Sequence, residues 1–215
     1  MTEHVVLFSG GIASWAAARR LADAGESMTL LFTDTRTEDP DLYRFIDQAA
    51  ADIGSPLVKI ADGRDIWEVF RDERMLGNSR FDPCSRVLKR DLSRRWLAEN
   101  APAATLVFGY DWTELHRFER SRDRWAPRPV IAPLTDKPYR LRDDWMNDLE
   151  DRGIVPPRLY RMGFDHNNCG GGCVKAGQGH FVRLLDRLPD VFATWEAKEQ
   201  EMRDLLAGKH GNYQN

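Results

Sequence analysis

The chain carries a glycine turn close to its start, in the run Phe8-Ser9-Gly10-Gly11-Ile12-Ala13-Ser14-Trp15. The apolar residues 5–8 predict a buried strand before the turn, and the alanine-rich residues 12–24 predict a helix after it. Glycine lets the backbone turn and approach a ligand closely, while serine hydroxyls and the free N–H groups of a first helical turn donate hydrogen bonds to anions. The run therefore predicts a phosphate cradle made by Ser9, Gly10, Gly11 and Ser14.

This turn is not a Walker loop. The Walker loop separates its glycines by four residues and ends in Gly-Lys-Ser/Thr. No such run occurs in the 215 residues. A tight turn between a strand and a helix, with no ligand, is the alternative interpretation, and it stays open at this point.

Strand-like and helix-like patterns alternate beyond the turn. Further strands are predicted at residues 28–33, 57–60 and 105–110, with a short one at most at 130–131. Helices are predicted at residues 40–53, 65–73, 83–99, 142–152, 179–188 and 190–207. Strands that alternate with helices at this spacing indicate a parallel sheet with crossover helices. We therefore expect an α/β fold with a doubly wound, mostly parallel, Rossmann-like sheet.

The domain organisation and composition limit the function further. Residues 1–155 are expected to form the α/β domain, and residues 156–215 a cysteine-containing loop and helices packed on it.

The net charge of −3 argues against a protein that coats nucleic acid, although basic residues cluster at 71–95 and 117–128. These clusters fit an anionic-substrate surface or solvated helix faces. No apolar run is long enough for a membrane span or a signal peptide. Three cysteines, an odd number, do not suit a disulfide framework. A cytoplasmic protein is therefore expected.

Polar residues follow three of the predicted strands. Ser9 follows the first strand, Asp34 and Thr35 end the second, and Gly109 follows the fourth. In a doubly wound sheet, ligands bind at the carboxyl ends of the strands, where these residues converge. Asp34 and Thr35 could bond a ribose, an adenine amine or a magnesium ion. An ordinary helix start with favourable acidic residues is the alternative for this segment.

A cysteine precedes basic residues in Cys84-Ser85-Arg86, with Lys89 following. A helix N-terminus flanked by Arg86 and Lys89 would lower the pKa of the Cys84 thiol and favour the thiolate, the form that binds metal or attacks sulfur. A buried, unreactive cysteine is the alternative. The polar neighbours of Cys84 favour a functional role for Cys84 and Lys89.

A fourth element has the spacing Gly109-x-Asp111-x-x-Glu114-x-x-Arg117. Its arginine could clamp a phosphate or sulfate through two hydrogen bonds, with Glu114 orienting the guanidinium. The alternative is an ion pair three residues apart on a surface helix. The position after a strand favours the clamp.

Two cysteines flank three glycines in Cys169-Gly170-Gly171-Gly172-Cys173. The glycines make a loop flexible enough to aim both sulfurs at one centre. Zinc would need a fourth ligand from His166, His180 or Asp165. Three thiolates without an evident fourth ligand suit a [4Fe-4S] cluster with one open iron, held by Cys84, Cys169 and Cys173. Plain redox thiols remain the third interpretation.

These motifs, in this order, resemble the PP-loop adenine nucleotide α-hydrolase-like superfamily. The resemblance is to its phosphoadenosine phosphosulfate (PAPS) reductase-like branch, including the small members in phage and bacterial genomes, and covers residues 5–175, about four fifths of the chain. The usual family loop is Ser-Gly-Gly-x-Asp-Ser. Here Ala13 stands in place of the aspartate and Ile12 in place of a frequent lysine. Any role of those two side chains must be supplied elsewhere or is absent.

The resemblance implies an adenine nucleotide in the crevice, with phosphates on the cradle and with Asp34, Thr35, Gly109 and Asp111 also contributing. ATP with Mg²⁺ is the expected nucleotide. Some PP-loop relatives thiolate tRNA through a cluster with one open iron, whereas the reductases use a mobile thiol near the C-terminus. No cysteine follows Cys173 in this chain.

We therefore expect an ATP-dependent sulfurtransferase that adenylates a carbonyl-type acceptor and inserts sulfur through a [4Fe-4S] cluster. The expected catalytic residues are Cys84, Lys89, Glu114 and Arg117. The partners would be a sulfur donor and a small-molecule or nucleobase acceptor, without extensive nucleic-acid contacts and with dimerisation left open. A sulfonucleotide reductase is the first alternative, and a non-catalytic adenine-nucleotide-binding module is the second.

Overall fold

A parallel sheet of five strands forms the centre of the molecule, which we describe from a computed structural model covering residues 4–207. The strand order is β3-β2-β1-β4-β5, and every neighbouring pair is parallel. The strands are β1 (His4–Leu7), β2 (Met28–Asp34), β3 (Leu57–Ala61), β4 (Thr105–Val107) and β5 (Val130–Ile131). The predicted parallel α/β architecture is confirmed.

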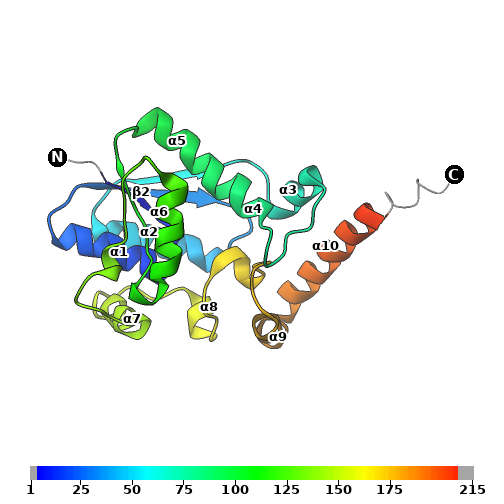
Figure 1. Cartoon of the computed structure of the whole chain (residues 1–215). Coiled ribbons are helices and arrows are strands. Elements are labelled where there is room, and N and C mark those ends of the chain that lie inside the picture. The colour runs from blue at the N-terminus through cyan, green and yellow to red at the C-terminus, as the bar shows by residue number, and fades with distance from the viewer. Residues whose placement is uncertain (1–3, 208–215) are drawn as a thin grey trace.

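Helices connect the strands and continue beyond the sheet (Figure 1). They are α1 (Ile12–Asp23), α2 (Pro40–Ile53), α3 (Ile66–Glu73), α4 (Pro83–Ser85), α5 (Leu92–Asn100), α6 (Leu115–Trp125), α7 (Arg142–Asp151), α8 (Arg158–Arg161), α9 (Gln178–Arg187) and α10 (Pro189–Ala207). A π-helical turn, η1 (Arg86–Asp91), joins α4 to α5. Three short 3₁₀ turns complete the description: η2 (Trp112–Glu114), η3 (Pro133–Thr135) and η4 (Asn168–Gly171).

Local sequence signals explain the bounds of α2. The Asp39 carboxylate accepts a hydrogen bond from the backbone N–H of Asp41 at 2.9 Å, and Pro40 occupies the first helical turn, where its missing N–H costs nothing. Gly54 ends the helix in the left-handed conformation, with φ 74°. The helix therefore has the predicted residues 40–53.

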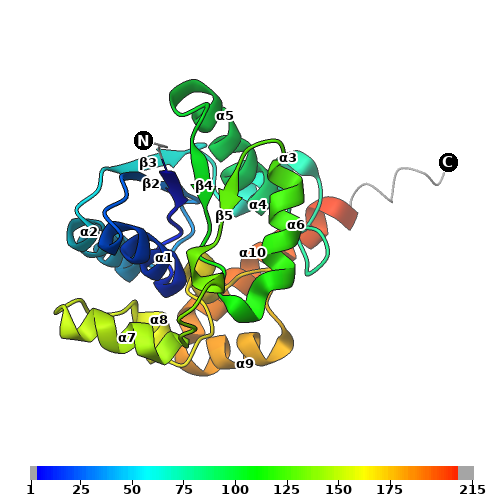
Figure 2. The same ribbon diagram turned by 60° about the vertical axis from the view of Figure 1, so that its left-hand side comes forward.

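Helices cover both faces of the sheet, as Figure 2 shows with α1 and α2 on one side and α5 on the other. Val6 and Leu30 belong to the buried cluster that includes α1, α2 and α7. Their strand neighbours Val5 and Leu31 belong to the cluster formed with α5 and α6. Successive strand residues point to opposite faces, so this alternation is what a doubly wound sheet requires.

The structure differs from the expected helices in three places, one of which is the short helix α8, where a loop was predicted. The single helix predicted at residues 83–99 is divided into α4, η1 and α5, because a π-helical turn interrupts it. Helix α6 was not among the predicted helices. Only Ser121 and Trp125 are buried on it, so its sequence has no apolar stripe to signal a helix.

The C-terminal helices pack beside the sheet domain. Helix α10 lies against α3, where the rings of Trp67 and Trp195 are 5.0 Å apart and Met202 is buried (Figure 1). Helix α9 packs with α8 around Phe164 and Leu184. Across residues 4–207, no helix combines the length and apolarity needed to cross a membrane.

The strand order places the ends of β1 and β4 beside each other. The chain leaves β1 toward β2 on one side of the sheet and reaches β4 on the other, so the order reverses between these two strands. A crevice forms at such a switch point, at the carboxyl ends of the strands. The turn after β1 and the segment after β4 both face it.

Candidate functional site

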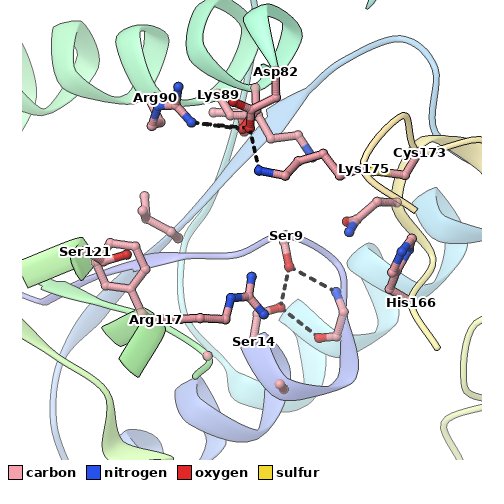
Figure 3. Close-up of a pocket in the computed structure, with 18 of the residues that line it drawn as sticks. Ser9, Ser14, Asp82, Lys89, Arg90, Arg117, Ser121, His166, Cys173 and Lys175 are labelled. Atoms are coloured by element: carbon pink, nitrogen blue, oxygen red, sulfur yellow. Dashed lines mark hydrogen bonds and ion pairs between the residues drawn. The ribbon is translucent and has the colours of Figure 1, made fainter. Parts of the chain in front are cut away.

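A cleft of about 830 Å³ opens at this switch point. Its lining comes from the β1–α1 turn, the end of β2, the α4–η1 segment, the β4–α6 segment and residues 160–175. Figure 3 shows Ser9 and Ser14 on one side, Lys89, Arg90 and Lys175 opposite, and Arg117 to one flank. Predicted site residues that line it are Ser9, Gly11, Ser14, Thr35, Cys84, Lys89, Gly109, Glu114, Arg117, Cys169 and Cys173.

The turn after β1, which we call the cradle wall, is held by its own hydroxyl groups. The Ser14 hydroxyl donates to the Gly11 carbonyl at 2.8 Å, and the Ser9 hydroxyl donates to Ser14 Oγ at 3.4 Å (Figure 3). Gly10 does not line the cleft. A Cβ at Gly10 would lie 2.5 Å from a methyl group of Leu42, and φ is +75°, so this glycine lets the turn pack on α2.

Gly109 brings the end of β4 into contact with the start of α1. A Cβ at this position would lie 2.7 Å from the backbone carbon of Ala13 and 2.7 Å from the nitrogen of Ser14. Backbone cannot yield to such an overlap, so glycine is required here. The close contact sets the width of the cleft beside the cradle wall.

Two residues of the C-terminal part clasp the cradle wall. The Asn167 amide donates to the Gly10 carbonyl at 3.0 Å. The Tyr160 hydroxyl lies beside the turn, 3.3 Å from where a Cβ at Gly11 would be, and burial raises the pKa of this phenol more than the Ile12 backbone lowers it. Both residues line the cleft. Neither was predicted from the sequence, because they lie in a stretch without periodicity.

Asp34 and Asp111 turn away from the cleft. The Asp34 carboxylate accepts hydrogen bonds from the Arg36 N–H and the Tyr43 hydroxyl, both at 2.8 Å. The Asp111 carboxylate accepts from the Thr113 N–H at 2.8 Å and so caps the turn η2. Neither side chain lines the cleft, and Ala13, which does, has no carboxylate to offer.

Basic side chains outnumber acidic ones around the cleft. Asp82 pairs with Arg90 at 3.6 Å and with Lys175 at 3.3 Å, and Glu114 pairs with Arg117 (Figure 3). The basic lining residues are Lys89, Arg90, Arg117, Arg120, Arg124 and Lys175, and the acidic ones are Asp82, Glu114 and Asp165. The excess positive charge favours an anionic ligand.

Glu38 links the end of β2 to the opposite side of the cleft. Its side chain is 1% exposed and accepts hydrogen bonds from the Lys89 amine at 3.3 Å and the Cys169 N–H at 2.7 Å. It also accepts from the Thr35 hydroxyl at 3.0 Å. Burial of the Lys89 amine lowers its pKa, but the Glu38 carboxylate and the nearby cysteines raise it more, so Lys89 stays charged.

Cys169 and Cys173 form a pair of neighbouring thiols that line the cleft. Cys169 sits at φ 52°, and Gly170 and Gly171 continue the left-handed turn that brings the two cysteines together. The neighbouring Cys169 thiol and Lys89 lower the pKa of Cys173 to about 6, while Cys173 and burial raise the pKa of Cys169. Cys173 is therefore the thiol of the pair that ionises first. We call this loop, with Lys89 and Glu38, the thiol wall.

Cys84 differs from its expected state. Burial raises the pKa of its thiol to about 11, and Lys89 lowers it too little to compensate. Its helix α4 has only three residues, and Arg86 points to Glu73, to which it is paired at 2.6 Å. The predicted lowering of the Cys84 pKa was wrong because desolvation outweighs the nearby positive charge.

The three cysteines line one cleft but do not form a metal-binding group. Within residues 4–207, no set of three histidine, cysteine or acidic side chains is arranged to hold a metal ion. The Cys169 and Cys173 thiols are free and lie beside each other, and Nε2 of His180 lies 2.7 Å from the Gly171 carbonyl oxygen. The arrangement does not fit a cluster or zinc ion held by these residues, so the expected [4Fe-4S] cluster has no support.

Residues 3–110, half of the chain, match the family model of the phosphoadenosine phosphosulfate reductase domain. No curated protein matches the sequence. A solved PAPS reductase from Candida auris, in a phosphate complex, has 14% sequence identity and a TM-score of 0.54, covering 75% of this chain and 78% of that one. A predicted subunit of tRNA methyltransferase from Methanocaldococcus jannaschii DSM has 20% identity and a TM-score of 0.44, covering 73% and 91%.

The Candida auris structure shows that the α/β fold is shared, and at 14% identity it shows the fold alone. The family match covers β1 to β4, and thus the cradle wall, Glu38, Cys84 and Lys89. The cleft at the switch point lies in the position where such folds bind nucleotides. The chain therefore belongs to the phosphoadenosine phosphosulfate reductase domain family of PP-loop proteins.

Proposed function

We propose that this protein catalyses adenine-nucleotide-dependent sulfur transfer, with Cys173 as the attacking residue and Cys169 as the resolving thiol. One observation carries the proposal: a pair of neighbouring thiols, Cys169 and Cys173, lines the same cleft as the cradle wall. A thiolate is the form that attacks, and a neighbouring thiol is what releases a product bound to it.

The nucleotide phosphates are proposed to bind at the cradle wall. Backbone N–H groups of the turn supply donors, and the hydroxyls of Ser9 and Ser14 add donors when a phosphate replaces their present partners, Ser14 Oγ and the Gly11 carbonyl. Lys89, Arg90 and Lys175 face them across the cleft and add positive charge (Figure 3). Mg²⁺ accompanying ATP would take most of its ligands from phosphates and water, which is usual for this ion.

The reaction has three steps. First, a carbonyl oxygen of the acceptor attacks the α-phosphate of ATP, and pyrophosphate leaves. Second, Cys173, loaded as a persulfide by an external sulfane-sulfur donor, attacks the activated carbon through its terminal sulfur, and AMP leaves. Third, the Cys169 thiolate attacks the Cys173 sulfur, which releases the thiocarbonyl product and leaves a Cys169–Cys173 disulfide. An external dithiol then reduces that disulfide.

The thiol wall favours this assignment of roles. Lys89 is charged and lowers the pKa of Cys173, so the attacking group stays ionised at neutral pH. Glu38 accepts hydrogen bonds from both the Lys89 amine and the Cys169 N–H, which holds the positive charge of Lys89 beside the cysteine loop. Arg117 and Glu114 lie at the other flank and are proposed to position the activated group.

Sulfonucleotide reduction is the second candidate. Here the Cys173 thiolate attacks the sulfur of an adenylylated sulfate, the nucleotide leaves, and Cys169 releases sulfite as the disulfide forms. The thiol pair supports this reaction because it supplies both electrons without a sulfur donor. A cluster held by all three cysteines would leave a reductase without an attacking thiol. Because Cys169 and Cys173 form a thiol pair, a thiol is available to attack, and this objection to a reductase no longer applies. Sulfur transfer is preferred because the cleft also extends along α6, which offers space and charge for an acceptor.

The experiment supplies the two substrate sets separately. One reaction contains ATP, a ³⁵S-labelled persulfide donor and candidate acceptors, namely free nucleotides, DNA and tRNA, and pyrophosphate, AMP and acceptor-bound label are measured. The other contains PAPS or adenylyl sulfate with dithiothreitol, and sulfite is measured. We expect acceptor-dependent pyrophosphate and label, with Cys173→Ser losing the label but keeping pyrophosphate release. Sulfite formation without pyrophosphate release would refute sulfur transfer and support the reductase. If neither pyrophosphate nor sulfite forms, the remaining interpretation is a non-catalytic nucleotide-binding module.

A further inference from the structure

Helix α6 presents a row of arginines to the cleft. Arg117, Arg120 and Arg124 line it together with Ser121. These positions are three or four residues apart, so they share one side of the helix. The acidic residues of the helix, Glu119 and Asp123, line neither this cleft nor the second cavity described below. The helix therefore separates its charges, with positive groups toward the cleft.

Two of these arginines have no acidic partner in the described part of the chain. Arg117 pairs with Glu114. Arg120 donates only to the His116 backbone carbonyl, at 3.3 Å, and Arg124 forms no ion pair within residues 4–207. Both side chains belong to exposed residues. Uncompensated guanidinium groups lined up beside a cleft favour an anionic ligand.

A second cavity of about 400 Å³ continues from the cleft past the end of α6. Arg124 and Trp125 line both cavities. Its walls mix flat apolar residues, Trp125 and three prolines, with the cationic residues Arg94, Arg124 and Arg128, and its lining holds no acidic residue. The Arg94 guanidinium lies 5.0 Å from the centre of the Trp125 ring. Flat apolar walls beside guanidinium groups suit a nucleobase with its phosphate.

The row and the second cavity form one cationic path beside the cleft. The seven residue steps from Arg117 to Arg124 rise about 10 Å along α6 at 1.5 Å per residue. The second cavity continues this path past the end of the helix and adds Arg94 and Arg128. Positive groups spread along such a path match a chain of several phosphates with bases better than they match the phosphates of a single nucleotide.

We infer that α6 and the second cavity bind a single-stranded segment of nucleic acid and deliver one of its bases to the thiol wall. The inference rests on the proposed sulfur transfer and names its acceptor. The reacting base must be unpaired, since a base stacked in a duplex cannot enter the cleft. The net charge of −3 is compatible with this, because the track is short and local. An acidic protein is disfavoured, since a concave cavity with flat apolar walls suits a base better than a protein surface.

The test measures binding of fluorescein-labelled 12-nucleotide single strands, one RNA and one DNA, by fluorescence anisotropy. The test variants are Arg120→Glu and Arg124→Glu. The matched control is Arg122→Glu, which makes the same charge change on the same helix at a residue lining neither cavity. We expect each test variant to weaken binding at least about tenfold and the control less than about threefold. The slope of log K against log salt should become shallower by about 0.7 for each phosphate that the variant no longer neutralises.

The same variants are titrated with AMP. We expect AMP affinity to stay unchanged, because the cradle wall is intact. Equal losses for AMP and oligonucleotide would place the arginines in the mononucleotide site and overturn the inference. The inference would also be overturned if Arg122→Glu weakened oligonucleotide binding as much as Arg120→Glu and Arg124→Glu do. Binding of polyglutamate as tight as that of the oligonucleotide would overturn it too. Oligonucleotide binding as expected, with no ³⁵S label entering any acceptor, would refute the sulfur transfer and leave the nucleic-acid track standing.

Discussion

The two facing walls of the cleft are built in different ways. The cradle wall is a backbone turn, fixed by the Ser14 bond to Gly11 and clasped by Tyr160 and Asn167. The thiol wall is a left-handed glycine loop whose chemistry depends on charge, through Lys89 and Glu38. Substitutions in the cradle wall should therefore change nucleotide affinity, and those in the thiol wall should change the rate and its pH dependence.

The largest effect is expected for Cys173→Ser. Without the attacking sulfur, the rate of sulfur transfer should fall at least about a thousandfold, the scale seen when a nucleophile is removed. ATP affinity, measured by calorimetry, should change less than about twofold because the cradle wall is untouched.

Cys84→Ser is the matched control for this substitution. Cys84 lines the same cleft, but its pKa is raised to about 11, so its thiol is protonated at neutral pH. We expect a loss of less than about tenfold. Equal thousandfold losses in both variants, together with the loss of protein-bound iron, would show that the cysteines act as one cluster and not as a separate thiol pair.

Gly11→Val tests the cradle wall. A Cβ at Gly11 would lie 3.3 Å from the Tyr160 hydroxyl and 3.5 Å from the Ser9 hydroxyl, so valine methyl groups would fill the space for a phosphate. The Kd for ATP should rise at least about thirtyfold, which corresponds to about 2 kcal/mol. Circular dichroism should show an unchanged fold.

Gly177→Val serves as the control for Gly11→Val. Gly177 also precedes a helix with negative φ, and a Cβ there meets nothing within 4 Å. Its ATP affinity should equal that of the unmodified protein. If Gly11→Val bound ATP normally, phosphate binding at the cradle wall would be refuted.

The pH dependence of Cys173 tests the thiol wall. The Cys173 pKa is about 6, below the ordinary 9.0, so alkylation of Cys173 by iodoacetamide should rise with a midpoint near pH 6. Cys169→Ala removes the neighbouring thiol that lowers the Cys173 pKa most, so the midpoint should move up by at least about one pH unit. Peptide-level mass spectrometry follows Cys173 alone. A midpoint that does not move would mean that Cys169 does not stabilise the Cys173 thiolate.

The lowered pKa also affects stability. The folded protein favours the thiolate more than the unfolded chain does, so this group stabilises the fold fully above about pH 9. That contribution is lost as the pH falls through about 6. The free energy of unfolding of Cys173→Ser, measured against pH, should lack this component.

The smallest effect is expected for Tyr160→Phe. Tyr160 lines the cleft and its hydroxyl lies beside Gly11, so its proton can be donated to a phosphate at the cradle wall. Loss of the hydroxyl should weaken ATP binding by about twofold to tenfold, the range for one hydrogen bond. Tyr43→Phe removes a hydroxyl that bonds Asp34 outside the cleft, and it should leave ATP affinity unchanged. Equal effects of the two variants would contradict a role for Tyr160 at the phosphates.

Much of the fold could be predicted from short-range patterns. The strands and α2 follow from apolar runs and from caps such as Asp39 and Gly54, which act within a few residues. Helix α6 and the π-helical turn η1 could not be predicted. Arginines dominate α6, and the extra residue of a π-helical turn leaves no mark on the apolar periodicity.

The site was predicted less completely, because its charges are set by contacts between distant segments. Glu38 is buried between Lys89 and Cys169, which are 51 and 131 residues away in sequence. No pattern around residue 38 signals these contacts. Cys84 shows the same limit, since its burial depends on the packing of α3 and α10 and outweighs the basic residues that follow it.

The π-helical turn η1 determines which residues share the cleft. It lies between Cys84 and the start of α5, and both Cys84 and Lys89 line the cleft. An ordinary α-helix over the same residues would place Cys84 and Lys89 about 140° apart around the helix axis, because they are five residues apart and each residue turns about 100°. A π-helical turn instead brings residues five apart to nearly the same side. Without this turn Lys89 would leave Glu38 although every functional residue is still present. Here the type of helical turn is as consequential as the choice of residue, and chains that share the motif but not the π-helical turn are not equivalent in chemistry.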